Sequence, residues 1–230
     1  MRILLSLLFC LGLSAQSLPF PGPGPLNGAP ETITQVGSGS ATSTTTLTIS
    51  LSPSVTAGQG IILPIRVYTT LSAGVSSCTA TNATFATPIY SAVSNSNRAA
   101  ICTGYASGTV SSVTITISAS GNIYAGVFSA SKVAPSSWQD LSVTATGTSS
   151  TATTGTTTGS LSSTEIVFNA LYYAGVFNAY DSGYTGLGST FGGVSLVAQW
   201  KEASSGQQSG TMTQTTSTYY AGALVTIKEQ

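Results

Sequence analysis

Apolar and polar residues alternate with a period of two along most of the chain. Leu47, Ile49 and Leu51 alternate with hydroxyl residues, and the same pattern recurs at 113–117 and 194–200. Such alternation places one face of a strand on a core and the other in solvent. Short stretches of Gly, Ser, Asn and Pro separate the runs. The pattern predicts an all-β fold of about twelve strands, arranged as a single antiparallel β-sandwich of jelly-roll type.

Local features refine this prediction. Pro64 interrupts a strand-like stretch at 61–68, and since proline is found mainly at sheet edges, we expect an edge strand there. Residues 120–122 (Ser-Gly-Asn) predict a hairpin turn. The Thr-rich segment 144–159 is either a linker between two domains or a strand and loop within one sandwich. Threonine favours β structure, which supports the second interpretation.

The first residues have the layout of a secretory signal peptide. Met1 and Arg2 precede an apolar run and then Ser14-Ala15, which predicts a signal peptide at 1–15. The run of about eleven residues is shorter than the roughly 20 that span a bilayer, so no membrane span is expected. Residues 16–30 are rich in Pro and Gly and predict an extended tether before a domain at 31–230. We therefore expect a secreted protein, extracellular or at the cell surface.

Charge is scarce in this sequence. Charged residues make up 5% of the chain, and six basic residues balance six acidic ones, whereas about 25% is typical of soluble domains. No basic stripe is present that would bind nucleic acid. Solubility must come from Ser, Thr, Asn and Gln.

The cysteines predict one structural disulfide. Cys10 lies in the signal peptide, which leaves Cys78 and Cys102 as a pair in an oxidising compartment. A redox or metal pair is the alternative, but neither a CxxC spacing nor partner ligands accompany these cysteines.

The sequence carries no catalytic motif. It contains no histidine, which excludes Ser-His-Asp and Cys-His catalysis and histidine-ligated metals or haem. No nucleophile elbow or phosphate-binding loop is present. We therefore expect no enzyme and no cofactor. A glycosidase built on two carboxylates stays open, although no pair is marked out by spacing among the acids Glu31, Asp140, Glu165, Asp181, Glu202 and Glu229.

Two further kinds of site have weak support. Jelly rolls can hold calcium through one or two acids and backbone carbonyls, and Asp140 and Asp181 are the candidates here. Asn82 begins an Asn-Ala-Thr glycosylation sequon, which matters only in a host that glycosylates such sites.

Aromatic residues are the best candidates for binding a ligand. Tyr180, Tyr184, Trp200 and Trp138 are large and amphipathic, and sugar rings stack on flat aromatic faces while neighbouring amides and hydroxyls bind their hydroxyl groups. Trp200 also matches the apolar face of its own strand, which favours core packing for it. Tyr180 and Tyr184 lie in a Gly-rich turn and are better surface candidates.

Weak compositional motifs carry a resemblance to known proteins. Residues 54–58 (Ser-Val-Thr-Ala-Gly), 111–116 (Ser-Ser-Val-Thr-Ile-Thr), 183–185 (Gly-Tyr-Thr) and 220–228 (the final Tyr-Ala-Gly strand) are the relevant segments. From 43 to 228 the chain resembles uncharacterised secreted bacterial β-sandwich domains. The resemblance implies a jelly-roll or Ig-like module, displayed on cell surfaces or in phage-related structural proteins. It carries over no catalytic residue.

These observations support several hypotheses. The first is an exported, non-enzymatic protein with a structural or adhesive role, whose partners are glycans, other surface proteins or copies of itself. The alternative is a carbohydrate-binding module that uses its surface Tyr and Trp residues. A third is an ice- or mineral-binding face built from the threonine ladders at 46/48 and 114/116.

Overall fold

The computed structural model describes residues 31–70 and 72–230, which form thirteen β-strands. The predicted all-β sandwich is confirmed. None of the described residues forms a helix long and apolar enough to cross a membrane. The predicted signal peptide (1–15) and tether (16–30) lie outside the described residues.

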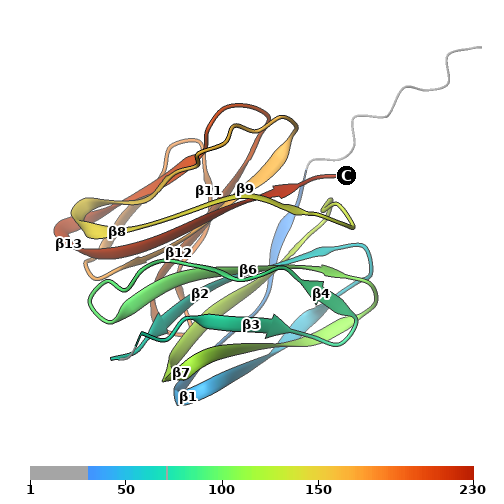
Figure 1. Cartoon of the computed structure of the whole chain (residues 1–230), viewed down its shortest axis with the longest axis horizontal. Coiled ribbons are helices and arrows are strands. Elements are labelled where there is room, and N and C mark those ends of the chain that lie inside the picture. Colours follow the sequence, from blue (N-terminus) through green and yellow to red (C-terminus); the bar gives the residue numbers. More distant parts are fainter. Residues whose placement is uncertain (1–30, 71) are drawn as a thin grey trace, which may run out of the picture. The chain divides into compact units, whose positions relative to one another are not determined.

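The strands form two antiparallel sheets, one of seven strands and one of six (Figure 1). The first sheet contains β1 (Ile33–Val55), β2 (Gly60–Tyr68), β3 (Val75–Thr79), β4 (Ala83–Phe85), β5 (Ile89–Tyr90), β6 (Asn97–Ala106) and β7 (Val110–Ala130). The second contains β8 (Gln139–Thr156), β9 (Glu165–Tyr173), β10 (Phe177–Tyr180), β11 (Thr185–Phe191), β12 (Val194–Ala203) and β13 (Ser209–Lys228).

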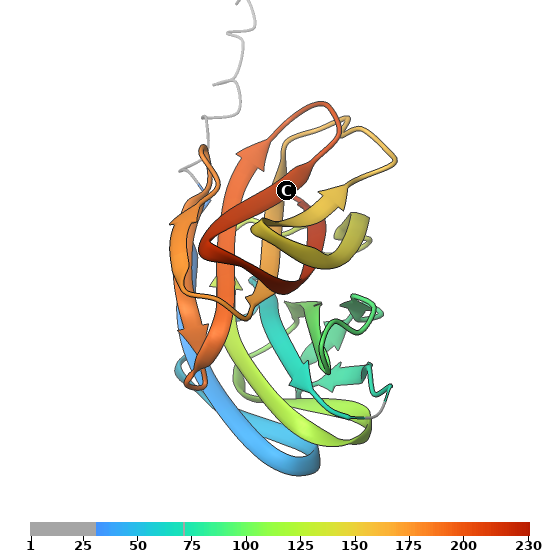
Figure 2. The same ribbon diagram turned by 90° about the vertical axis from the view of Figure 1, so that its left-hand side faces the viewer.

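The first sheet folds over on itself because its long strands β1 and β7 bend. Residues 33–44 of β1 pair with 121–130 of β7, and beyond the bend residues 46–55 pair with 110–116. Figure 2 shows both strands curling. β2 and β6 extend the first layer, and β3 pairs with β7 in the second. We call this half of the protein, residues 33–130, roll 1.

The second sheet repeats this arrangement, and we call residues 139–228 roll 2. β8 and β13 are its long bent pair, β9 and β12 extend one layer, and β10 pairs with β13 in the other. In each roll the first and last strands therefore pair with each other in both layers, as in a jelly roll. The sequence predicted a single jelly-roll-like sandwich, whereas the structure repeats the strand order in each half of the chain.

The two rolls pack against each other through the layers that contain β2, β6, β9 and β12, which we call the inner sheets. An apolar cluster joins these sheets, and its larger members are Ile62, Ile101, Phe128, Trp138, Ile166, Phe168, Phe191, Leu196, Val225 and Ile227. β2, β6 and β9 are consequently buried on both faces along most of their length. All nine residues of β9 are buried, for example.

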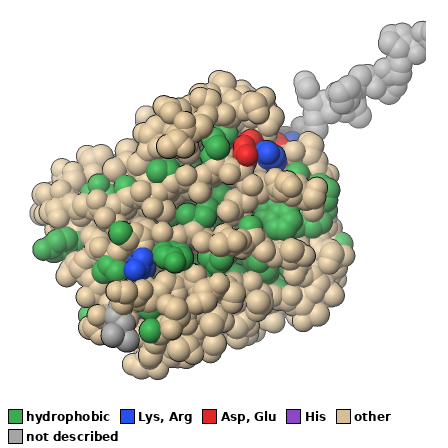
Figure 3. Space-filling model, viewed as in Figure 1, with side chains coloured by type: hydrophobic (Ala, Val, Ile, Leu, Met, Phe, Trp, Pro, Cys, Tyr) green, Lys and Arg blue, Asp and Glu red, His purple; other side chains and the backbone are tan. Residues whose placement is uncertain are grey.

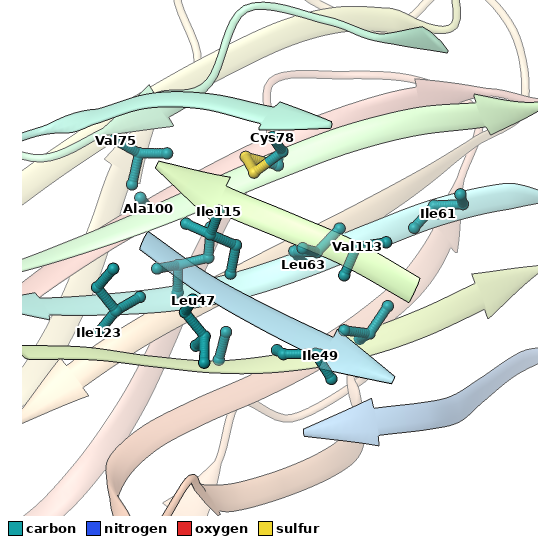
Figure 4. Packing of buried hydrophobic residues seen from close by; sticks show 14 of the residues in the cluster. Leu47, Ile49, Ile61, Leu63, Val75, Cys78, Ala100, Val113, Ile115 and Ile123 are labelled. Carbon is teal, nitrogen blue, oxygen red and sulfur yellow. A yellow bond between two sulfur atoms is a disulfide. The ribbon is translucent and has the colours of Figure 1, made fainter. Parts of the chain in front are cut away.

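A second apolar core fills the space between the two layers of roll 1 (Figure 4). The predicted disulfide crosses this core, since Cys78 of β3 is bonded to Cys102 of β6 with their Cα atoms 6.3 Å apart. Both cysteines are buried. The prediction of a structural bridge is confirmed, and the bridge ties the outer layer of roll 1 to its inner sheet.

Two local predictions are wrong: the edge strand at Pro64 and the hairpin turn at 120–122. Pro64 does not mark an edge, because β2 lies between β6 and β7. Pro64 has no backbone N–H to donate. It is tolerated because the ladder with β7 has no paired residues between Ile62 and Ile65, so no hydrogen bond to β7 is lost there. Residues 120–122 form no hairpin turn, because β7 continues through them and bends there from one layer to the other. The segment 144–156 is part of β8, as expected from its threonines.

We expect the disulfide to contribute roughly 3 kcal/mol to the free energy of unfolding, by the loop-closure estimate for a separation of 24 residues. The double substitution Cys78→Ala with Cys102→Ala should lower the stability measured by urea unfolding by about that amount. A variant as stable as the wild type would show that the disulfide does not stabilise the fold.

Candidate functional site

The described surface offers very little charge for recognition. On the face shown in Figure 3, hydrophobic side chains are scattered among uncharged side chains and backbone, and only a few basic and acidic side chains are visible. A ligand that binds here must therefore be recognised through apolar contacts and neutral hydrogen bonds rather than through charge.

Trp138 occupies the segment that leads from roll 1 into roll 2, directly before β8. Its backbone carbonyl accepts a hydrogen bond from the Lys228 amide at 2.8 Å, and its ring stacks on Tyr105 of β6 with centroids 6.1 Å apart and planes inclined by 28°. Aromatic pairs in such offset geometry are favourable beyond the area that they bury. The indole is consequently held in one orientation, with 9% of the residue exposed.

A shallow pocket of about 300 Å³ lies beside Trp138, and we call it the Trp138 pocket. Its other lining residues are Ala86, Thr87, Ser137 and Gln139. The segment before β5 forms one wall, fixed by a backbone hydrogen bond from Ala86 to β6. β8 begins the other wall at Gln139. The lining therefore combines one aromatic ring with two hydroxyl groups and one amide, and it contains no charged side chain.

The indole N–H of Trp138 is buried and has no hydrogen-bond partner among the described residues. A buried donor without a partner costs about 1–3 kcal/mol, and buried Trp N–H groups usually find one. The side-chain amide of the neighbouring Gln139 already makes one hydrogen bond, because its Oε1 accepts from the Thr103 hydroxyl at 2.7 Å. Trp138 thus carries an unused donor, which is itself buried from solvent.

A second pocket adjoins the first across the same short segment. It measures about 220 Å³ and shares Ala86 and Thr87 with the Trp138 pocket. Its remaining lining residues are Ser76, Ser77, Cys78, Phe85 and Pro88. Together the two pockets provide binding space on both sides of residues 86–87, which suits an extended ligand better than a compact one.

The predicted residues Tyr180 and Tyr184 lie in roll 2, away from Trp138. Tyr180 packs on Phe177 with ring centroids 4.7 Å apart and is half-buried. The Tyr184 hydroxyl donates a hydrogen bond to the Ser209 carbonyl at 2.7 Å, and burial raises the pKa of Tyr184 to about 12. Both rings therefore serve the packing of roll 2 as well as its surface.

Trp200 also belongs to roll 2, on β12. It is half-buried and packs against the apolar cluster between the inner sheets, whereas Tyr184 packs on the other side of β12, against the cluster that contains Val167 and Leu224. The structure therefore does not bring the four predicted aromatic residues into one platform. Of the set, Trp138 lines the pocket described above.

The two calcium candidates have protein partners. Asp140 forms an ion pair with Lys228, with Nζ 3.3 Å from Oδ1, and Asp181 Oδ2 accepts a hydrogen bond from the Thr211 amide at 2.9 Å. Among the described residues, no group of three His, Cys, Asp or Glu side chains is placed to hold a metal ion.

Glu165 is a fully buried acid at the start of β9. Burial raises the pKa of its carboxyl group, and the nearby charge of Asp140 raises it further. The nearby Thr226 hydroxyl and the charge of Lys228 act in the opposite direction. Neither carboxylate oxygen has a hydrogen-bond partner among the described residues. The folded protein therefore binds a proton at Glu165 more readily than the unfolded chain does.

Three more acids gather around the beginning of β1 and the end of β13. The Glu31 carboxylate accepts hydrogen bonds from the backbone amides of Ser131 and Lys132, and Glu202 accepts one from the Glu31 amide at 3.0 Å. Burial raises the pKa of Glu229, with Glu202 and Glu31 adding to the shift. These contacts join distant segments, and none of the three acids lines the Trp138 pocket.

The predicted threonine ladders exist as cross-strand pairs. Thr46 lies opposite Thr116 and Thr48 opposite Thr114, and the hydroxyls of the second pair are 2.9 Å apart. Roll 2 carries matching pairs on its outer layer, Thr151 with Thr213 and Thr153 with Thr211. Thermal hysteresis measurements remain the test of an ice-binding role for these ladders.

Sequence reasoning named Trp138 but missed the residues around it. Tyr105, Ala86 and Thr87 come from roll 1 and meet Trp138 only because the inner sheets stack. No local pattern in the sequence marks them. Comparisons with protein-family models, curated proteins and solved structures find no match for this chain.

The raised pKa of Glu165 predicts a pH-dependent loss of stability. An acid whose pKa is higher in the folded state contributes stability that is fully present below its unfolded pKa of about 4.3 and is lost as the pH rises through the folded value. Glu165→Gln should therefore gain stability relative to the wild type as the pH rises from about 4 to 7. Urea unfolding at several pH values measures this gain, and a difference that does not change with pH would contradict it.

Proposed function

We propose that this chain is an exported protein that works by binding rather than by catalysis, and that it binds neutral carbohydrate at the Trp138 pocket. Such binding would give it an adhesive or structural role outside the cell or on its surface. One observation carries the proposal: Trp138, whose buried indole N–H has no partner among the described residues, lines a pocket that is otherwise formed by residues with hydroxyl, amide and methyl groups.

The chemistry of the pocket favours a sugar over other ligands. A pyranose presents C–H groups that pack on an aromatic face and hydroxyls that accept and donate hydrogen bonds. Thr87 and Ser137 are exposed at the rim and can exchange such bonds. The indole N–H is buried in this structure and would donate one to a ligand only after the pocket wall moves aside. The absence of charge from the lining disfavours anionic ligands, whose desolvation would be uncompensated.

The size and openness of the site favour a chain of sugars. Pockets for small ligands usually measure about 300–1,000 Å³, and the Trp138 pocket lies at the lower end of that range. The adjoining pocket across residues 86–87 extends the available surface. We infer that the ligand is a segment of a neutral polysaccharide, held along the surface rather than enclosed.

Two observations support export and a non-enzymatic role. The Cys78–Cys102 bridge fits an oxidising compartment, in agreement with the predicted signal peptide. The sequence contains no histidine, and none of the acids lines the pocket.

We expect the purified protein to bind insoluble neutral polysaccharides in a pull-down, and neutral oligosaccharides on a glycan array. Trp138→Phe keeps an apolar ring but removes the donor, so it should weaken binding roughly five-fold, the equivalent of about 1 kcal/mol for one hydrogen bond. Thr87→Ala removes an exposed hydroxyl from the rim and should weaken binding without affecting the core.

Trp200→Phe is the matched control, because Trp200 packs against the inner-sheet core and lines no part of the Trp138 pocket. It should leave the affinity unchanged. An affinity that falls in Trp200→Phe but not in Trp138→Phe would place the site in roll 2. Binding that disappears on calcium chelation would direct attention to Asp140 and Asp181.

A further inference from the structure

Strand β8 leaves one side of its backbone without a partner strand. Among the described residues β8 pairs with β13 and with no other strand. In an antiparallel sheet, every second residue of such a strand points its N–H and C=O groups away from the neighbour. These groups form a row that another extended strand can join.

The central part of this edge is unusually regular. Residues from Ser142 to Ser149 pair with β13 in eight consecutive steps, from Val225 to Thr218, with no register shift. The stretch has the sequence Ser-Val-Thr-Ala-Thr-Gly-Thr-Ser. It contains no charged residue and no proline, which are the usual devices that prevent a strand edge from pairing.

Every other edge in the described part of the chain is short or irregular. β1 has four register shifts along its ladder with β7, and β11 has two along its ladder with β12. β3, β4, β5 and β10 contain only five, three, two and four residues. Bulges and short strands blunt an edge, so the 142–149 stretch is the edge best suited to accept a partner.

We propose that this edge pairs with the same edge of a second copy of the chain, antiparallel and related by a two-fold axis, so that the two inner sheets of roll 2 join into one. Such an interface is self-complementary, since each copy offers the strand that the other needs. With no charge in the stretch, bringing two copies together creates no like-charge repulsion.

The side chains of the stretch suit this pairing. Hydroxyl residues occupy one face, at 142, 144, 146 and 148, and the small residues Val143, Ala145 and Gly147 occupy the other. Cross-strand Thr–Thr and Thr–Ser pairs are favourable in antiparallel sheets. Eight residues at about 3.4 Å each give an edge roughly 27 Å long.

The test is the molar mass of the purified protein, measured by sedimentation from micromolar to millimolar concentrations. We expect a dimer whose population rises with concentration. Thr146→Lys places a charge at the centre of the edge, where the two copies would bring like charges together, and should leave a monomer. A wild-type protein that stays monomeric throughout would overturn the proposal.

Thr114→Lys is the matched control, because Thr114 lies on β7 between β1 and β3 and is similarly half-exposed. It adds the same charge away from an edge and should still dimerise. A dimer that survives Thr146→Lys would contradict the proposed interface. Circular dichroism and urea unfolding establish that both variants are folded.

A second measurement does not depend on the lysine variant. Amide hydrogen exchange of the wild type should slow at residues 142–149 as the concentration rises, while exchange on β11 stays constant. Protection that appears elsewhere, or nowhere, would contradict the proposal. Because residues 142–149 do not line the Trp138 pocket, monomeric Thr146→Lys should keep its carbohydrate binding, which separates the two proposals.

Discussion

The apolar layer between the two inner sheets is the contact on which the remaining structure depends. Phe128 of β7 lies within it, with its ring 5.9 Å from Phe168 and 5.6 Å from Phe191 between centroids. Burying such rings is a main source of stability. The stacking also decides which segments meet at the margin of the sheets, and it brings residues 86–87 of roll 1 beside Trp138. The candidate site is therefore a consequence of the contact between the rolls.

The two rolls share a strand order but brace their layers by different chemistry. Cys102 lies on β6, which pairs with β2, and Gln199 lies on β12, which pairs with β9. Cys102 is joined to Cys78 by the disulfide, whereas Gln199 accepts a hydrogen bond from the Asp181 amide at 3.0 Å and donates one to the Thr211 carbonyl at 2.8 Å. A buried amide is tolerated because its bonds are made, so roll 2 keeps its layers together without a covalent bridge.

The sequence was sufficient for the strands, the sandwich and the disulfide, because period-two alternation and cysteine pairing are local or simple signals. The sequence did not reveal that the strands at 33–55 and 110–130 each take part in two layers. Gly, Ser and Asn residues occur both in turns and in bends of a continuous strand, so the sequence alone does not distinguish the two. The edge-strand prediction from Pro64 failed for a related reason. The interruption of the ladder between β2 and β7, which accommodates the proline, has no signature in the sequence. Trp138 was named on its amphipathic chemistry, but its partners come from distant segments.

The most direct test of the account observes the Trp138 indole itself. The chain contains two tryptophans, so a ¹⁵N-labelled sample shows two indole N–H resonances, which Trp138→Phe assigns. On titration with a neutral oligosaccharide, the Trp138 resonance should move downfield as its unpaired N–H gains an acceptor, while the Trp200 resonance stays in place. A bound oligosaccharide that leaves the Trp138 resonance unmoved would contradict the proposed site.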